Sequence, residues 1–145
     1  MTTVSTMPGH LIRRLHQIST QVFLSRVKEA GFDLTPVQFA ALDAVGRHPG
    51  IDQARLSDEV AKDRATIGAV VDRLERKGLV ARDVDETARR ARRLLLTTEG
   101  EALLAALRPV VEALQAEILS GLTRSEYRQF VALAAKVAGH SRAVT

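Results

Sequence analysis

Apolar residues recur at helical spacing near the start of the chain. One face of a helix would carry four of them: Leu11, Leu15, Ile18 and Val22. Gly31 follows the last turn of this pattern, and glycine readily adopts the left-handed conformation that ends many helices. We therefore predict an amphipathic helix over 9–31, preceded by a disordered lead-in over 1–8.

The segment "TPVQ" at 35–38 is a start signal for a second helix. Thr35 can cap the helix, Gln38 can complete a capping box, and Pro36 suits the first helical position. The cluster "GRHPG" at 46–50 then breaks the periodic pattern. A helix is expected between these two signals.

Two further helices are predicted over about 53–61 and 64–77. Asp63 suits the N-cap of the second, and Gly78 suits the position after its last turn. Its apolar residues form one stripe: Ile67, Val70, Val71 and Leu74. Its opposite face is polar or small: Thr66, Ala69, Arg73 and Lys77, with Ala65 and Gly68 beside them. Small side chains there would let another molecule approach the helix closely.

Two short strands and two long helices complete the pattern. The segments at 79–84 and 92–97 indicate strands, and the polar residues between them indicate a hairpin loop. A helix is then predicted to about residue 120. It begins at Thr97 or Thr98, and Thr98 could form a capping box with Glu101. Thr123 and Glu126 repeat this start signal for a last helix that runs to about Gly139.

Composition narrows the class of protein. The 145 residues suit one domain or two closely joined subdomains, and an aromatic content of only 3% favours an aliphatic, mainly helical core. No apolar run approaches the roughly 20 residues of a bilayer span, and the first residues lack the pattern of a signal peptide. We therefore expect a cytoplasmic protein with no membrane partner.

The sequence gives little support to a catalytic or metal-binding function. With no cysteine, the chain has no disulfide, no thiolate nucleophile and no cysteine-ligated zinc. It contains no glycine-rich phosphate loop, no His-Glu-x-x-His and no nucleophile elbow. His10 and His16 are six residues apart, about 240° around a helix. We expect no enzyme activity, no metal and no cofactor.

Positive charge is concentrated at one point, although the net charge of +4 is modest. Four arginines lie within 89–93, at the end of the predicted hairpin loop and the start of its second strand. Such a run, by itself, is usually a solvated loop. After a helix-turn-helix, however, a basic hairpin tip can lie along a DNA backbone or enter the minor groove. The order of elements predicts a winged helix-turn-helix whose second helix, 64–77, enters the major groove.

From Leu34 to about Leu104 the chain resembles the MarR family of bacterial transcription regulators. The resemblance rests on four motifs taken together: "LTPVQ", "DRATIGAVVDRLERKGLVAR", "ARRA" and "LTTEG". It implies a mainly α fold with a small β-hairpin wing, in which 34–97 form the DNA-binding lobe. The helices at 9–31 and 98–140 would join two chains into a homodimer. Each lobe would then bind one half-site of a pseudo-palindromic operator in double-stranded DNA.

The resemblance also assigns DNA-contacting residues in the wing. Arg90 falls on the family's DNA-inserting arginine, and Arg89 is its neighbour. Where the family commonly has an aspartate that braces the wing, this chain has Ala88. We expect a looser wing, or a substitute brace from Asp83 or Asp85.

In the predicted helix-turn-helix, three residues of the second helix are candidates for contacts to bases or phosphates: Arg64, Thr66 and Arg73. The alternative is an ordinary exposed helix face on which Arg73 pairs with Asp72 or Glu75. Ser57 is a candidate for a phosphate contact, with a plain surface serine as the alternative. An interaction module that has lost DNA binding is disfavoured by the arginines retained on both helix and wing.

A polar ridge on the first helix is a candidate effector site. It comprises His10, Arg14, Gln17 and Gln21. Members of the family often bind small aromatic acids, and "GHLIRRLHQI" resembles the branch that controls breakdown of hydroxycinnamates, benzoates and nicotinates. Arg14 would hold the carboxylate and His10 a second oxygen. The alternative is an exposed or dimer-interface ridge. The resemblance thus implies a repressor that a small organic acid releases from DNA.

Overall fold

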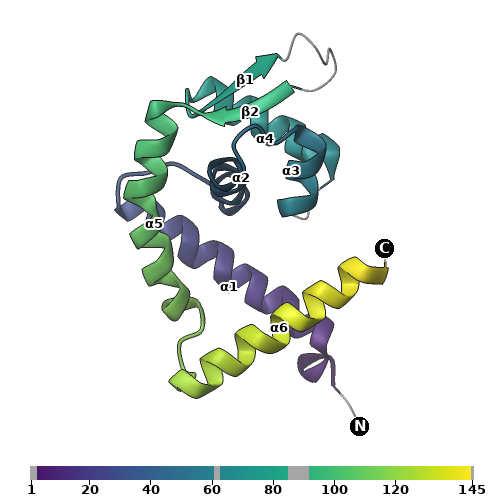
Figure 1. The fold of residues 1–145 in the computed structure, drawn as a ribbon. Helices are drawn as coiled ribbons and strands as arrows, with labels where there is room; N and C mark the ends of the chain where they lie inside the picture. The colour runs from purple at the N-terminus through teal and green to yellow at the C-terminus, as the bar shows by residue number, and fades with distance from the viewer. Residues whose placement is uncertain (1–2, 61–62, 85–91, 145) are drawn as a thin grey trace.

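Six α-helices and one two-stranded antiparallel sheet make up the fold in a computed structural model that describes residues 3–60, 63–84 and 92–144 (Figure 1). The helices are α1 (Pro8–Glu29), α2 (Pro36–Arg47), α3 (Gln53–Val60), α4 (Arg64–Arg76), α5 (Thr98–Ile118) and α6 (Arg124–Val144). The strands are β1 (Val80–Val84) and β2 (Arg92–Leu96). The mainly α fold with a β-hairpin is therefore confirmed, with element boundaries mostly within two residues of those expected.

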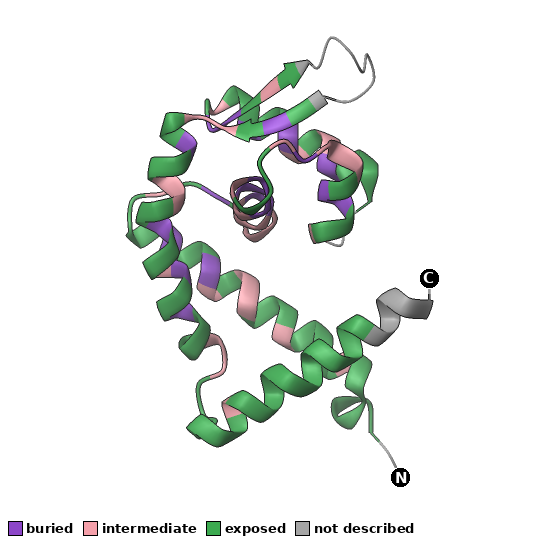
Figure 2. Ribbon diagram, viewed as in Figure 1, coloured by how far each residue is buried: buried purple, intermediate pink, exposed green. Residues whose placement is uncertain are grey.

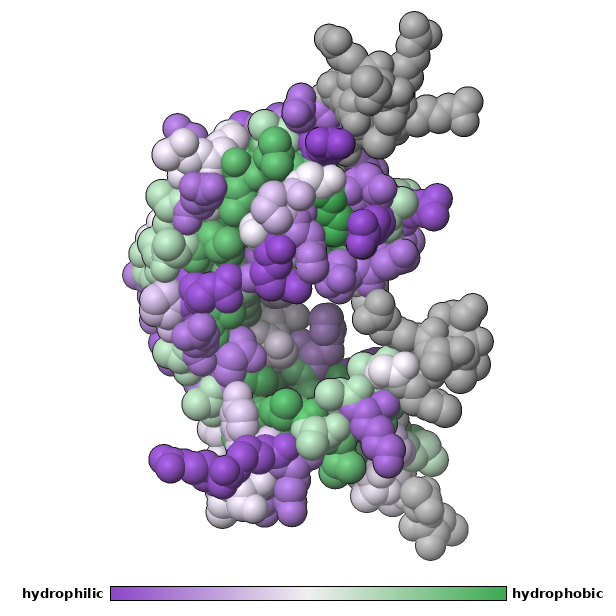
Figure 3. Space-filling model, viewed as in Figure 1, coloured by the Kyte–Doolittle hydropathy of each residue, from purple (hydrophilic) through white to green (hydrophobic). Residues whose placement is uncertain are grey.

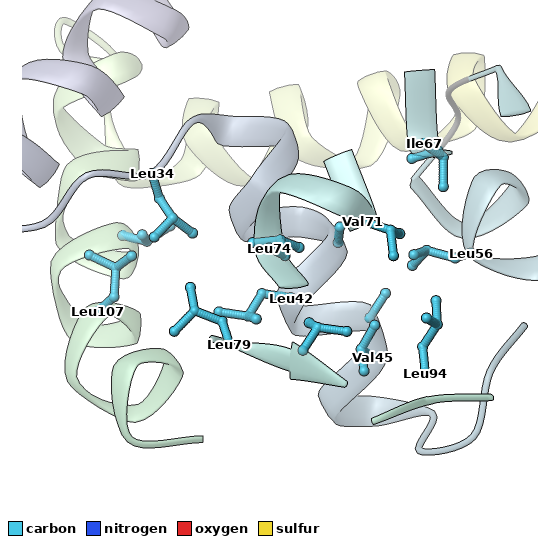
Figure 4. Packing of buried hydrophobic residues seen from close by; sticks show 14 of the residues in the cluster. Leu34, Leu42, Val45, Leu56, Ile67, Val71, Leu74, Leu79, Leu94 and Leu107 are labelled. Carbon is cyan, nitrogen blue, oxygen red and sulfur yellow. The ribbon is translucent and has the colours of Figure 1, made fainter. Parts of the chain in front are cut away.

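Helices α2, α3 and α4 pack with the hairpin into one unit, which we call the winged-helix lobe (Figure 1). Its core is aliphatic, and the largest fully buried side chains of the lobe are Leu42, Val45, Leu56, Ile67, Val71, Leu74 and Leu94 (Figure 4). The predicted apolar stripe of α4 thus faces inward. Because Ile67, Val71 and Leu74 are no more than 1% exposed, the opposite face of α4 is the one left for solvent.

Three predicted helix ends have the expected geometry. The N–H of Gln38 donates to Thr35 Oγ1, and the N–H of Thr35 donates to Gln38 Oε1, both at 3.1 Å. Asp63 caps α4 through a hydrogen bond from the N–H of Thr66. Gly78 has a φ of 76°, in the left-handed region that ends α4. These signals are local in sequence, which is why the pattern alone revealed them.

The start of α5 decides between Thr97 and Thr98 as the N-cap and shows that the expected capping box does not form. Thr97, not Thr98, is the N-cap, and its hydroxyl accepts from the N–H of Gly100 at 3.0 Å. The same hydroxyl donates to the carbonyl of Gly78 at 2.6 Å, so it joins the end of α4 to the start of α5. The expected capping box of Thr98 with Glu101 is wrong because Thr97 already occupies the capping position.

The two ends of the chain also differ from expectation. Residues 4–6, within the expected disordered lead-in, form a single 3-10 turn, closed by hydrogen bonds from the N–H and hydroxyl of Thr6 to the carbonyl of Thr3. Helix α1 begins at Pro8, which suits a first helical position. At the other end, the Thr123–Glu126 capping box is confirmed, and α6 continues to Val144 instead of ending near Gly139.

Helices α1, α5 and α6 extend away from the lobe (Figure 1). Helix α1 packs on α5, and Phe23 of α1 also stacks at a tilt on Phe39 of α2. Helix α6 is different, because every side chain described in it is exposed apart from the half-buried Tyr127 (Figure 2). The lobe therefore has a closed core, whereas α6 projects as a nearly bare helix.

Candidate nucleic-acid interface

The solvent face of α4 is made of small and polar side chains. Thr66, Ala69 and Arg73 are all exposed on it, as the sequence predicted. Arg64, in the first turn, is exposed as well. An α-helix with this kind of face fits the major groove of B-DNA, where side chains reach base edges.

The first turn of α4 is organised by Asp63. Its Oδ1 accepts from the N–H of Thr66, and its Oδ2 accepts from the hydroxyl of Thr66, both at 2.8 Å. These backbone and side-chain hydrogen bonds from Thr66 keep the pKa of Asp63 below its usual range. Asp63 is therefore ionised at neutral pH, and the side chain of Thr66 is held in one orientation.

Arg73 does not make the ion pairs that an ordinary helix face would provide. Asp72 accepts from Arg82 Nη2 at 2.7 Å, and Glu75 lies 3.5 Å from Arg82 Nη1. Because Arg82 holds both acids, the exposed guanidinium of Arg73 has no hydrogen-bond or ion-pair partner among the described side chains. Its charge remains available for an anionic ligand.

Arg82 is a residue that the sequence reasoning missed. It lies in β1, two residues after the buried Val80 and directly across from the buried Leu94 in the hairpin register. Only 17% of its side chain is exposed. The signal was present in the sequence, because a charged residue on the inward face of a strand needs an oppositely charged partner. Which partner it finds depends on the packing of β1 against α4.

Outside α4, the structure describes only some of the residues predicted to contact DNA or to brace the wing. Four residues of the predicted wing lie outside the described residues: Asp85, Ala88, Arg89 and Arg90. Asp83 is described and stands across from Arg93 in the register of the hairpin. Ser57 is only 4% exposed, so the alternative of a plain surface serine is wrong. Burial gives no support to a direct phosphate contact from its hydroxyl.

The candidate effector residues lie on α1. His10 is half-buried and Arg14 is exposed, and the apolar stripe beside them is only partly covered, with Leu11 still 46% exposed. The molecule is hollowed between the winged-helix lobe and the terminal helices (Figure 3). The residues of the ridge are thus accessible in a single chain.

Two cavities lie elsewhere, and neither is lined by His10 or Arg14. One, of about 430 Å³, lies between the C-terminal parts of α1 and α5, where Arg26 and Glu117 form an ion pair at 2.6 Å. The other, of about 340 Å³, lies between α2 and α5 and contains Asp43, which accepts from both Arg47 and Arg108. Both cavities are therefore framed by charged side chains already paired with one another.

The described residues offer neither a metal-ligand cluster nor a membrane-spanning helix. They contain no group of three or more histidine or acidic side chains placed to hold a metal ion. None of their helices is long and apolar enough to cross a bilayer.

Known proteins resemble this chain over nearly its whole length. The model of the MarR family matches residues 32–91. The transcriptional regulator HosA of Escherichia coli O157:H7 is 35% identical over 135 residues, which cover 93% of this chain and 97% of HosA.

Solved structures show the same relationship. BpsR of Bordetella bronchiseptica, described in a study of how 6-hydroxynicotinic acid regulates its DNA binding, matches with a TM-score of 0.87 and 28% identity, covering 95% of this chain and 97% of BpsR. PcaV of Streptomyces coelicolor, in complex with its natural ligand, matches with a TM-score of 0.87 and 33% identity, covering 97% of this chain and 98% of PcaV. The fold, the family model and these relatives agree: the chain belongs to the MarR family and is a winged helix-turn-helix transcription regulator.

Proposed function

We propose that the protein is a homodimeric repressor that binds a pseudo-palindromic DNA site and leaves it when a small aromatic organic acid binds. One observation carries the DNA-binding part of this proposal. The exposed face of α4 presents small side chains and the guanidinium of Arg73, which has no partner among the described side chains because Arg82 holds the neighbouring acids. A packed helix with such a face suits a polyanionic groove.

The proposed DNA contacts come from α4 and the wing. Thr66 faces base edges, while Arg64 and Arg73 reach bases or phosphates. Arg89 and Arg90 are proposed, from the family resemblance, to enter the minor groove at the tip of the hairpin. Ser57 is left out of this set because it is buried.

The proposed dimer is supported by apolar side chains that a single chain leaves exposed. On α6, Phe130, Leu133 and Val137 form a stripe at helical spacing and are 36%, 63% and 62% exposed. We propose that 9–31 and 98–140 form the dimerisation region and 34–97 the DNA-binding lobe. Two-fold symmetry would then set the two α4 helices roughly 34 Å apart, one turn of the duplex.

The proposed effector is an aromatic carboxylic acid. BpsR responds to 6-hydroxynicotinic acid, and the chain resembles it over nearly its full length. In this chain Arg14 would hold the carboxylate and His10 a second oxygen, both from the polar ridge of α1. Release requires that the acid bind more tightly to a dimer whose α4 helices are misplaced for the operator. The protein would act in the cytoplasm, on the chromosome, without catalysing a reaction.

The proposal can be tested with two linked experiments. Duplexes are first selected from a random library by the protein at low salt, and candidate acids such as hydroxynicotinates and hydroxybenzoates are then titrated into the complex. Arg14→Ala should require at least about tenfold more acid for release, because a charged hydrogen bond is lost. Arg13→Ala removes the adjacent exposed arginine and should behave as the unchanged protein does.

Either of two results would contradict the proposal. If no duplex is enriched at low salt, the protein is not a DNA-binding regulator. If duplexes are enriched but no acid that binds the protein displaces them, the proposed release mechanism is wrong.

A further inference from the structure

The hydrogen bonds between Asp63 and Thr66 fix the position of a proton. A carboxylate has no hydrogen to donate, so the 2.8 Å contact between Thr66 Oγ1 and Asp63 Oδ2 must use the hydroxyl hydrogen of Thr66. The second oxygen, Oδ1, accepts from the N–H of Thr66 at 2.8 Å. The carboxylate is thus held at both oxygens by one residue.

This arrangement limits what the first turn of α4 can offer a ligand. A hydroxyl has one hydrogen, and that of Thr66 is already committed, so only oxygen lone pairs and the methyl group remain to face outward. Asp63 likewise has only lone pairs to offer. Both side chains are exposed, so the pair forms a surface that accepts hydrogen bonds and donates none.

A phosphate is a poor partner for such a surface. Helix N-termini often bind phosphates through free N–H groups, but here the carboxylate of Asp63 occupies that place on α4. Phosphate oxygens are anionic and only accept hydrogen bonds, so they would be repelled. The major groove offers two donors to an acceptor, the N6 amino group of adenine and the N4 amino group of cytosine.

We propose that Asp63 and Thr66 together read the exocyclic amino group of one adenine or cytosine in each half-site of the operator. This inference rests on the proposed function, because it needs α4 to lie in the major groove. It adds a specificity for bases that the arginines do not supply, since Arg64 and Arg73 can only donate.

Two variants separate this role from a structural one. Thr66→Val keeps the shape and the methyl group but removes the hydroxyl. Asp63→Asn keeps an N-cap, because the amide oxygen must face the N–H of Thr66. The amide nitrogen then faces Thr66 Oγ1 and can only donate to it, which frees the hydroxyl hydrogen. The freed hydroxyl can donate to guanine or thymine, so the preference should broaden.

The experiment uses duplexes selected by the unchanged full-length protein. Each adenine of a half-site is replaced in turn by purine and each cytosine by 2-pyrimidinone, which lack the amino group. At one position the unchanged protein should lose affinity by about threefold to tenfold per half-site, as expected for one hydrogen bond. Thr66→Val should be insensitive at that position. Thr98→Val, the same change at an exposed residue of α5, should remain sensitive.

Selection from a random library by Asp63→Asn completes the test. It should enrich guanine or thymine at that position alongside the original base. The inference is overturned if no position responds to loss of an amino group, if Thr66→Val responds as strongly as the unchanged protein, or if Asp63→Asn keeps the original preference. Failure to select any duplex would instead refute the proposed function, so the two failures are distinguishable.

Discussion

The winged-helix lobe buries its large apolar side chains, whereas helix α6 exposes them to solvent. In the lobe, Leu42, Leu56 and Leu74 have no exposed surface. On α6, Leu133 and Val137 are each more than 60% exposed, although they are similar in chemistry and lie at helical spacing (Figure 2). A lobe that buries its own core can fold within one chain, whereas an apolar helix stripe in water needs a second surface.

The free energy available at that second surface is substantial. Burial of a Leu or Val side chain stabilises by about 1.5–3 kcal/mol. Several such side chains on α1 and α6, counted twice in a symmetric pair, can exceed the cost of association. The same exposed stripe that looks incomplete in one chain is therefore the strongest physical support for the proposed dimer.

The largest expected effect comes from placing charge on the α6 stripe. In the Leu133→Glu/Val137→Glu double variant, two buried apolar contacts per chain would be replaced by carboxylates, and dimer affinity should fall by at least about 100-fold. Sedimentation velocity measures the change. Arg124→Gln/Arg128→Gln alters the net charge of α6 by the same amount on the opposite face of the helix and should leave the dimer intact. Retention of the dimer in the first variant would show that α6 is not its interface.

A smaller effect is expected within the lobe, at Gly100. A Cβ at this position would collide with the carbonyl oxygen of Leu79, where α5 passes close to the end of α4 and the start of β1. Gly100→Ala should therefore lower the free energy of unfolding by about 1–3 kcal/mol. Urea denaturation measures it, with Gly9→Ala as the control because no atom of the described residues lies near the added Cβ. Equal stability of the two variants would contradict the close approach.

The smallest effect concerns the ion pairs of Asp43 in α2, one with Arg47 of the same helix and one with Arg108 of α5. Burial tends to raise the pKa of Asp43, but hydrogen bonds from Arg108 and Arg47 outweigh it and hold the pKa below its usual range. The stability that Asp43 contributes is therefore present at neutral pH and lost as the pH falls below about 4. It should amount to less than about 1 kcal/mol, since both arginines are exposed to solvent.

This pH dependence is measurable in a variant. The difference in unfolding free energy between the unchanged protein and Asp43→Asn should be constant from pH 8 to 5 and shrink below about pH 4. Asp58→Asn, at an exposed residue of α3, is the control. A difference that grows on acidification would show that the assigned ion pairs do not stabilise the fold.

The sequence predicted those features that depend on neighbours along the chain. The capping residues Thr35 and Asp63 and the apolar stripe of α4 were all identified from spacing. The motifs were also sufficient to identify the MarR family, as the relatives confirm.

Features that depend on tertiary packing were missed. Arg82 meets Asp72 only because β1 packs beside α4, and burial of Ser57 depends on how α3 is seated in the lobe. The choice of Thr97 over Thr98 likewise depends on the nearby carbonyl of Gly78. The Asp63–Thr66 acceptor pair required side-chain geometry as well, since spacing alone gives the cap but not the position of the hydroxyl hydrogen.

The central claim is that two lobes, held together by the terminal helices, bind one duplex. Sedimentation of the unchanged protein with a selected duplex over a series of salt concentrations tests it most directly. We predict two chains per duplex and a logarithm of affinity that falls linearly with the logarithm of salt concentration as lysines and arginines displace counterions. One chain per duplex, or an affinity that does not change with salt, would contradict the account.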